Sequence, residues 1–186
     1  RWALRRASVV IAVSEWERRQ LRQDFDVEAQ VIPNGLDIDR FRTATPESRE
    51  RPYLLTVGRL VEYKGVQHVV RALANRRLAE FRLVVAGSGP YRDRLEAIAD
   101  EEGVADRVTF AGYVDDDRLP GLYAGASVFL SLSTVEAYGM TVAESLAAGT
   151  PCVGREAGAL SDWVSHMGGV GISGPTPEAV ATGGTA

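Results

Sequence analysis

The sequence predicts an α/β protein whose parallel sheet is covered by helices on both faces. From residue 53 onward, short apolar and β-branched runs alternate with helical patterns, which is the order expected of repeated βαβ units. The apolar runs are hydrophobic along their whole length rather than at every second position, as strands buried on both faces are. The connections between such strands are expected to be right-handed.

The elements of this alternating region follow one another closely. Its strands are predicted over residues 53–58, 81–87, 107–114, 127–130, 150–153 and 170–172. Its helices are predicted over residues 65–76, 91–102, 117–123, 139–148 and 159–164, and Pro177 can open one more short helix. The predicted sheet therefore has about six strands.

The chain before residue 53 lacks this alternation. An apolar run over 8–13 predicts a strand, and Ser14 and Glu17 form a capping box at the start of a helix over 15–23. A second short strand is expected over 30–32. These elements look like the end of one structural unit rather than a complete domain.

We therefore divide the chain into two parts. Residues 1–35 are interpreted as the remnant of an N-terminal domain together with an interdomain linker, and the polar stretch over 40–52 as a further tether. Residues 36–186 are interpreted as the second domain, cut short at its C-terminal end. On this interpretation the chain is a piece of a longer protein.

The composition is that of a soluble globular protein. Of the 186 residues, 45% are hydrophobic and 25% are charged. The net charge of -4 argues against a nucleic-acid partner, and no apolar run approaches the roughly 20 residues of a membrane span. Cys152 is the only cysteine, which argues against a disulfide framework and a thiolate metal site. A cytoplasmic location is the default expectation.

A loop with two cations joins the first strand of the alternating region to its first helix. Arg59 and Lys64 lie between Gly58 and Gly65, and Lys64 is the only lysine of the chain. Two cations beside a helix start can hold one phosphate group. An exposed loop whose charges merely keep it soluble explains these residues equally well, and the pattern is not a Walker loop.

The next two predicted strands also end in glycines. Gly87 and Gly89 follow the second strand, and Gly112, Tyr113 and Val114 end the third. The first pair is a weak nucleotide signal, because a tight strand-to-helix turn accounts for it at least as well. Backbone groups near Tyr113 and Val114 could contact the edge of a base.

The stretch over residues 131–149 carries the strongest functional signal. Glu136 lies in the loop after an apolar strand, Gly139 precedes a helix, and Glu144 falls in the second turn of that helix. A fresh helix start beyond the carboxyl end of a parallel strand is a natural anion site. Glutamates near helix starts are also common because they complement the helix dipole. Taken with the other strand ends, this stretch predicts a pocket for a ligand that bears phosphates and hydroxyls.

Ordered motifs in these segments resemble those of the group 1, family 4 glycosyltransferases. The motifs are VIPNGLDIDRF (31–41), VGRLVEYKG (57–65), LVVAGSGP (83–90), VTFAGYV (108–114), LPGLYAGASVFLSLS (119–133), EAYGMTVAE (136–144) and AAGTPCV (147–153). The resemblance covers about residues 8–175. That family consists of retaining, nucleotide-sugar-dependent enzymes with two Rossmann-like domains in the GT-B arrangement. The resemblance implies that this chain holds the Rossmann-like, donor-binding C-terminal half.

The resemblance also implies roles for the candidate residues. Arg59 and Lys64 would bind the donor diphosphate and stabilise the leaving nucleotide. Glu136 would lie beside the donor sugar, and Glu144 would bind the ribose hydroxyls. Further donor contacts are expected from Gly58, Gly87 and Gly89, from Tyr113 and Val114 at the base, and from the backbone amides of Tyr138, Gly139, Met140 and Thr141.

The implied reaction is the transfer of a sugar, of the hexosyltransferase type, from a UDP-, GDP- or ADP-sugar to an unknown acceptor with retention of configuration. No metal and no other cofactor is expected. The family's acceptor site, and any peripheral membrane attachment, lie in the N-terminal domain, so the isolated chain is expected to be inactive. Residues 158–162 depart from the family's Gly-Gly-x-x-Glu element. This departure leaves open the alternative of a catalytically inactive nucleotide-sugar-binding module.

Overall fold

The fold is centred on one parallel sheet of six strands. In this computed structural model, which describes residues 2–166 and 169–183, the strand order is β5-β4-β3-β6-β7-β8 and every pairing is parallel. The strands are β3 (Tyr53–Val57), β4 (Arg82–Ala86), β5 (Val108–Gly112), β6 (Val128–Ser131), β7 (Cys152–Arg155) and β8 (Val170–Ile172). The predicted α/β class and the predicted parallel sheet are confirmed.

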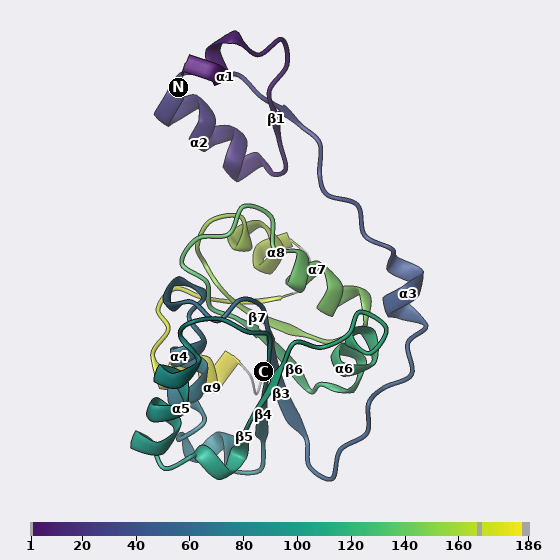
Figure 1. Ribbon diagram of the computed structural model, residues 1–186, viewed down its shortest axis with the longest axis vertical. Helices are drawn as coiled ribbons and strands as arrows, with labels where there is room; N and C mark the ends of the chain where they lie inside the picture. The colour runs from purple at the N-terminus through teal and green to yellow at the C-terminus, as the bar shows by residue number, and fades with distance from the viewer. Residues whose placement is uncertain (1, 167–168, 184–186) are drawn as a thin grey trace.

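Helices cover both faces of this sheet (Figure 1). One face carries α4 (Val66–Ala72), α5 (Arg92–Glu101) and α9 (Pro177–Gly183), and the other carries α3 (Ile38–Arg42), α6 (Leu119–Gly125), α7 (Met140–Ala147) and α8 (Leu160–His166). Successive residues of β3 alternate between the two cores, so that Leu54 packs into the first and Leu55 into the second. Short 3-10 helices lie at Glu62–Lys64, Arg76–Leu78 and Ala105–Arg107.

The bounds of every predicted helix differ by one or more residues from those in the structure, and two helices show how. The helix expected over 65–76 ends at Ala72 and is followed by the 3-10 turn Arg76–Leu78. The helix expected to begin at Asp117 begins at Leu119, because the amides of Arg118 and Leu119 both donate to the Asp115 carbonyl and form a turn before the helix.

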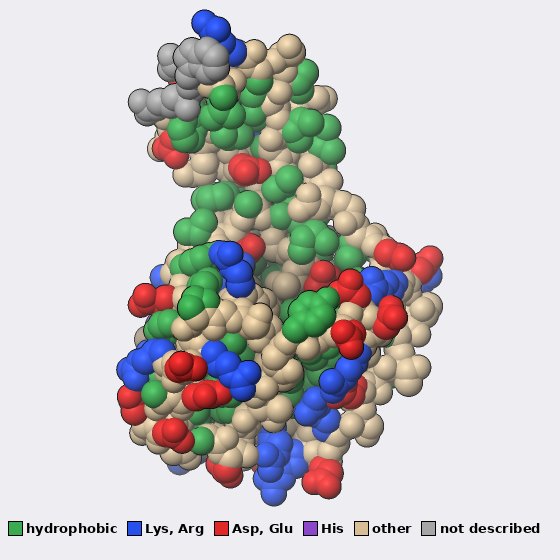
Figure 2. All heavy atoms as spheres, in the orientation of Figure 1, with side chains coloured by type: hydrophobic (Ala, Val, Ile, Leu, Met, Phe, Trp, Pro, Cys, Tyr) green, Lys and Arg blue, Asp and Glu red, His purple; other side chains and the backbone are tan. Residues whose placement is uncertain are grey.

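The N-terminal lobe, which we define as residues 2–32, has a small sheet of its own. It consists of α1 (Trp2–Arg6), β1 (Ile11–Ala12), α2 (Glu15–Phe25) and β2 (Gln30–Val31), with β1 and β2 paired in parallel. It stands apart from the six-stranded sheet, and the molecule narrows between the two (Figures 1 and 2). The predicted cap is present, since Ser14 Oγ accepts from the Glu17 amide at 3.1 Å. The strand predicted over 8–13 is wrong in length, because only Ile11 and Ala12 pair.

The polar segment over 40–52 is packed onto the body rather than free. It begins within α3, whose Phe41 is buried and meets the Tyr123 ring edge-on at 6.0 Å. Further along, the Glu47 amide donates to the Gly121 carbonyl at 2.8 Å, and the Glu47 carboxylate pairs with Arg118 at 2.9 Å. The segment therefore runs along α6 in a fixed position.

Cys152 lies in β7 and is buried. Burial raises the pKa of its thiol to about 12. A thiol with such a pKa is a core residue rather than a reactive group.

Candidate functional site

A groove opens where the strand order of the sheet reverses, between β3 and β6. From β3 the chain moves to β4 and β5 on one side, and later to β6, β7 and β8 on the other. In parallel sheets the carboxyl ends of the strands at such a switch point form a crevice in which ligands bind. Most of the predicted site residues follow the ends of β3, β4, β5 and β6, and therefore lie at this one edge. Glu144 lies further along, in the second turn of α7, and is not among the residues that line the pockets at this edge.

Two adjoining pockets form the groove. They share Val57, Gly58, Arg59 and Ala86 in their walls. The narrower pocket is further lined by Thr56, Leu60, Lys64, Val66, Ser131, Glu136 and Thr141. The wider one, of about 270 Å³, is further lined by Gly87, Ser88, Tyr113, Val114, Asp116 and Leu119. The structure thus brings residues from four strand ends into one continuous depression.

The glycines after β4 allow two loops to touch. A Cβ atom at Gly87 would lie 1.9 Å from the Gly58 carbonyl oxygen, and one at Gly89 would lie 2.3 Å from the Leu60 carbonyl oxygen. Gly87 also has a φ of 129°, which residues with a side chain rarely adopt. These glycines therefore pack the turn after β4 directly on the loop after β3, and shape the floor of the groove.

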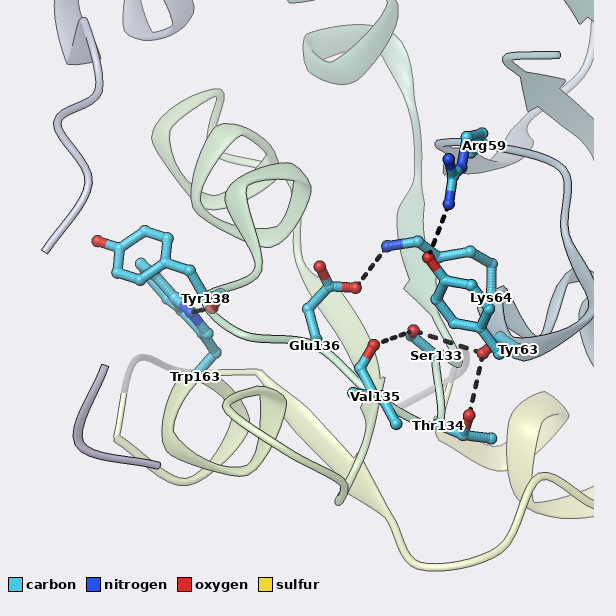
Figure 3. A network of polar contacts seen from close by, with 9 residues as sticks. All are labelled: Arg59, Tyr63, Lys64, Ser133, Thr134, Val135, Glu136, Tyr138 and Trp163. Atoms are coloured by element: carbon cyan, nitrogen blue, oxygen red, sulfur yellow. Dashed lines mark hydrogen bonds and ion pairs between the residues drawn. The ribbon is translucent and has the colours of Figure 1, made fainter. Parts of the chain in front are cut away.

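Lys64 and Glu136 meet in the narrow pocket. Lys64 Nζ lies 2.7 Å from Glu136 Oε2, and the two side chains are 25% and 21% exposed. Gly65, with a φ of 74°, lets the loop turn into α4 with its backbone against the Leu132 carbonyl, which a Cβ atom would approach to 2.1 Å. Arg59 points to a different partner, since its Nη2 donates to the Tyr63 hydroxyl at 3.3 Å (Figure 3).

The loop that carries Glu136 is fixed from two sides. On one side the Thr134 amide donates to the Tyr63 carbonyl at 2.8 Å, and on the other the Ala159 amide donates to the Glu136 carbonyl at 2.9 Å. A Cβ atom at Gly158 would lie 2.8 Å from that same Glu136 carbonyl oxygen. The segment over 158–162, which departs from the family pattern, therefore supports the Glu136 loop directly.

The start of α7 borders the same region. Gly139 is the N-cap, in the left-handed conformation with a φ of 96°. The amide of Val142 donates to the Gly139 carbonyl at 3.0 Å, so the amides of Met140 and Thr141 come too early in the helix to have an intrahelical acceptor. These amides carry the positive end of the helix dipole, and Thr141 lines the narrow pocket.

Tyr138 turns its side chain away from the cations. Its ring packs edge-on against Trp163, with centroids 5.4 Å apart, and Trp163 Nε1 donates to the Tyr138 carbonyl. The Tyr138 hydroxyl donates to the Asn34 carbonyl at 3.3 Å. Figure 3 shows Tyr138 and Trp163 on the far side of Glu136 from Lys64. The ring therefore anchors the loop, and a ligand contact from its amide stays a prediction.

Glu144 lies one helical turn beyond Thr141 on α7, on the same helix face. Its Oε2 accepts a hydrogen bond from the Tyr123 hydroxyl at 2.8 Å. Burial raises the pKa of Glu144, while the Tyr123 hydrogen bond and the positive charge of Arg40 lower it. Nothing local in the sequence singles out Tyr123, which lies in an apolar helical pattern 21 positions before Glu144.

Tyr113 and Val114, which are predicted to contact the base, both line the wider pocket but differ in exposure. Tyr113 is 74% exposed at the rim, whereas Val114 is buried in the wall. Asp116 and Leu119, which are not among the predicted site residues, line the same pocket. Acidic and basic side chains are interspersed over the face of the body drawn in Figure 2.

Other candidate binding features in the described part of the chain bring together fewer of the predicted site residues. A cleft of about 460 Å³ lies between the N-terminal lobe and α8, but its wall is mostly apolar and includes neither Lys64 nor Glu136. Within residues 2–166 and 169–183, no three His, Cys, Asp or Glu side chains come close enough to hold a metal ion. In the same residues no helix is long and apolar enough to cross a membrane.

Comparison with known proteins gives family matches over both parts of the chain. Residues 37–183 match the family described as "Glycosyl transferases group 1", and residues 1–40 match "Glycosyltransferase Family 4". Among curated proteins, the chain is 36% identical to a GDP-mannose-dependent alpha-(1-6)-phosphatidylinositol monomannoside mannosyltransferase of Mycobacterium tuberculosis. That match covers 93% of this chain and 50% of the relative. It is 33% identical to 2-deoxystreptamine glucosyltransferase of Streptomyces kanamyceticus, over 90% of this chain and 47% of the relative.

A solved structure shares the fold. HepE of Anabaena, in complex with UDP and glucose, superposes with a TM-score of 0.86 at 23% identity, over 98% of this chain and 54% of that one. The chain thus spans about half the length of the curated relatives it matches. The family match extends over most of the sequence, including every residue of the groove. The chain belongs to the group 1 glycosyltransferases, and its sheet is the Rossmann-like sheet of their GT-B fold.

Proposed function

We propose that this chain is the donor-binding part of a glycosyltransferase that transfers a sugar from a nucleoside diphosphate sugar to an acceptor with retention of configuration. The proposal rests mainly on the ion pair of Lys64 and Glu136, which lies in a pocket bordered by the start of α7. The donors named for its relatives, such as GDP-mannose, are of this chemical class. The donor of this chain is a UDP-, GDP- or ADP-sugar, and no other cofactor takes part.

The phosphate end of the groove stabilises the leaving group. When the bond between the sugar and the nucleoside diphosphate breaks, negative charge grows on the departing phosphate. Preorganised cations and amide dipoles lower the energy of that state, and Lys64, Arg59 and the amides of α7 supply them. The Lys64 ammonium has several donors, so it can keep Glu136 and contact a phosphate oxygen at the same time.

Glu136 holds the donor sugar next to this charge. Its loop is clamped by Tyr63 and Ala159, so the carboxylate has a defined position, and an ionised carboxylate accepts hydrogen bonds from sugar hydroxyls. Glu144 accepts from the ribose, and Tyr113 and Val114 flank the base. The acceptor binds to an N-terminal domain, so the isolated chain binds the donor and transfers little or no sugar.

A second candidate is a nucleotide-sugar-binding module without turnover. It is favoured by the segment over 158–162, because that segment touches the Glu136 loop and departs from the family pattern. Restoring Gly-Gly-x-x-Glu through Ala159→Gly and Asp162→Glu, in a chain joined to its N-terminal domain, separates the two. Transfer by the unaltered protein supports the enzyme, and transfer only after restoration supports the module.

Calorimetric titration of the chain with UDP, GDP and ADP tests the donor site. We expect one diphosphate to bind, and Arg94→Ala to leave that binding unchanged, because Arg94 pairs with Glu101 at 2.6 Å on the exposed face of α5. If none of the three binds, the proposed donor site is wrong. If the isolated chain transfers sugar to an added acceptor at a rate typical of such enzymes, the proposed need for a second domain is wrong.

A further inference from the structure

The Tyr123 hydroxyl is held in a fixed position by its surroundings. The side chain is fully buried, and its ring meets Phe41 and Phe129 edge-on with centroids 6.0 and 5.4 Å away. The Tyr123 carbonyl accepts from Thr150 Oγ1 at 2.6 Å, which also fixes the backbone of α6 at this point. A hydroxyl so placed can act only on the group in front of it, which is Glu144.

The Glu144 carboxylate depends on this hydroxyl for its orientation. Its Oε2 accepts from Tyr123 at 2.8 Å, and no second hydrogen-bond donor to this carboxylate is seen in the described part of the chain. Arg40 on α3 acts on it by charge and favours the ionised form, while Asp116 in the loop before α6 disfavours it. One oxygen is thus fixed, and the other keeps its acceptor capacity for a ligand.

From this geometry we propose that Tyr123 is a positioning residue, which aims Glu144 at the ribose hydroxyls and so sets the preference of the site for ribonucleotides over deoxyribonucleotides. The inference rests on the proposed function, since it assigns the nucleotide to this groove. A phenol is a suitable anchor, because burial and the Glu144 charge keep the pKa of Tyr123 well above its ordinary value. It therefore stays a neutral donor near neutral pH.

Loss of the hydroxyl changes the carboxylate in two ways. The carboxylate is free to rotate about its last side-chain bond, because nothing replaces the donor at Oε2. It also becomes easier to protonate, because a hydrogen bond that lowers its pKa is gone. Both changes weaken recognition of a ribose hydroxyl, and neither affects contacts to phosphate.

The test compares Tyr123→Phe with Tyr53→Phe. Tyr53 is also buried, and its hydroxyl donates to the Leu122 carbonyl at 2.7 Å, so its loss removes a buried hydrogen bond without touching Glu144. The probe is whichever of UDP, GDP and ADP binds the wild-type chain, together with its 2′-deoxy and 3′-deoxy forms. We expect the wild type and Tyr53→Phe to bind the ribonucleotide roughly tenfold or more tightly than at least one deoxy form. In Tyr123→Phe this ratio is expected to fall below about threefold.

The ratio is then measured between pH 5 and pH 8, which lies above the ordinary pKa of a glutamate, because the pKa of Glu144 is raised. The deoxynucleotide carries the same phosphates, so their titration cancels in the ratio. As the pH is lowered, the preference for ribose should be lost at a higher pH in Tyr123→Phe than in Tyr53→Phe.

The outcomes separate the inference from the function on which it rests. Unchanged ratios in Tyr123→Phe, or equal losses in the two variants, would overturn the positioning role and leave the donor site intact. If no diphosphate binds the wild-type chain, the proposed donor site and this inference are both wrong. If Tyr123→Phe does not fold, Glu144→Gln supplies the test, because the wild-type pH dependence of the ratio must then be lost.

Discussion

Glu136 and Glu144 lie on either side of the start of α7, and their surroundings differ in kind. Glu136 is paired with a cation at 2.7 Å in a partly exposed loop. Glu144 is set in a helix against a neutral, fully buried phenol, and burial raises its pKa. We propose that the cation beside Glu136 suits that end to a phosphate, and that the neutral donor beside Glu144 leaves its carboxylate as an acceptor for hydroxyls.

Two identical side chains in one motif therefore have different partners, and we expect those partners to give them different chemistry. The ion pair of Lys64 and Glu136 contributes about 1 kcal/mol or less to folding, because both groups reach water. The Tyr123–Glu144 hydrogen bond is more buried than this ion pair, so breaking it leaves a buried polar atom without a hydrogen-bond partner. The Lys64–Glu136 ion pair is therefore expected to exchange partners readily, whereas the Tyr123–Glu144 hydrogen bond is expected to persist.

The largest effect is expected at the phosphate end. In Lys64→Ala, binding of the nucleoside diphosphate should weaken roughly 10- to 100-fold, because a charge-assisted hydrogen bond is lost. The free energy of unfolding should change by about 1 kcal/mol or less. Calorimetric titration and urea unfolding measure the two quantities. Binding by Lys64→Ala as tight as that of Arg94→Ala would show that the cation does not contact the phosphates.

A smaller effect is expected where the two ends join. Gly139→Ala places a side chain at a φ of 96° and within 3.2 Å of Leu160 and Trp163. We expect it to lower the free energy of unfolding by about 1–3 kcal/mol and to weaken diphosphate binding, because the start of α7 must move.

Gly103→Ala is the matched control for this substitution. Gly103 also has a positive φ, of 66°, but a Cβ atom there meets nothing within 4 Å and the residue lies outside the groove. The control should lose stability and keep full binding. Equal binding losses in the two variants would mean that instability, rather than the position of α7, causes the loss.

The smallest effect is a pH dependence at the ribose end. The pKa of Glu144 is raised in the folded state, so the folded chain binds this proton more tightly than the unfolded chain. Ionisation of Glu144 therefore costs stability above its folded pKa, and this cost is absent below its unfolded pKa. Glu144→Gln should gain stability relative to wild type as pH rises through that window, as measured by urea unfolding between about pH 4 and pH 8.

Glu101→Gln gives the opposite sign and serves as the control. The hydrogen bond from Arg94 lowers the pKa of Glu101. Its contribution is present above its unfolded pKa and is lost as pH falls through its folded pKa. A pH-independent difference between wild type and Glu144→Gln would show that Glu144 is no harder to ionise in the folded chain.

The sheet and the cationic end of the groove were predictable because their signals are local. Apolar runs marked the strands, and loops after them must meet at one edge of a parallel sheet. The same reasoning placed Lys64 and Glu136 together although 72 positions separate them. What the sequence could not tell is that Arg59 turns to Tyr63, since the direction of a long side chain depends on neighbours in space.

Elements set by tertiary packing escaped prediction. The helix α3 was not predicted because its sequence is largely polar. It is stabilised by the burial of Phe41 against Tyr123. The strand over 8–13 was overestimated, because its Val9 and Ile11 are 63% and 54% exposed and only two residues pair. Tyr123 carries no local sign of its role, because only the fold brings its hydroxyl to Glu144.

The most direct test of the two-ended site is a crystal structure of this chain with its nucleoside diphosphate bound. We predict that the terminal phosphate lies within hydrogen-bond distance of Lys64 Nζ and of the amides at the start of α7. We also predict that the ribose hydroxyls lie at Glu144, with the Tyr123–Glu144 hydrogen bond kept. A nucleotide bound instead in the apolar cleft between the N-terminal lobe and α8, or with its ribose away from Glu144, would contradict the proposed site.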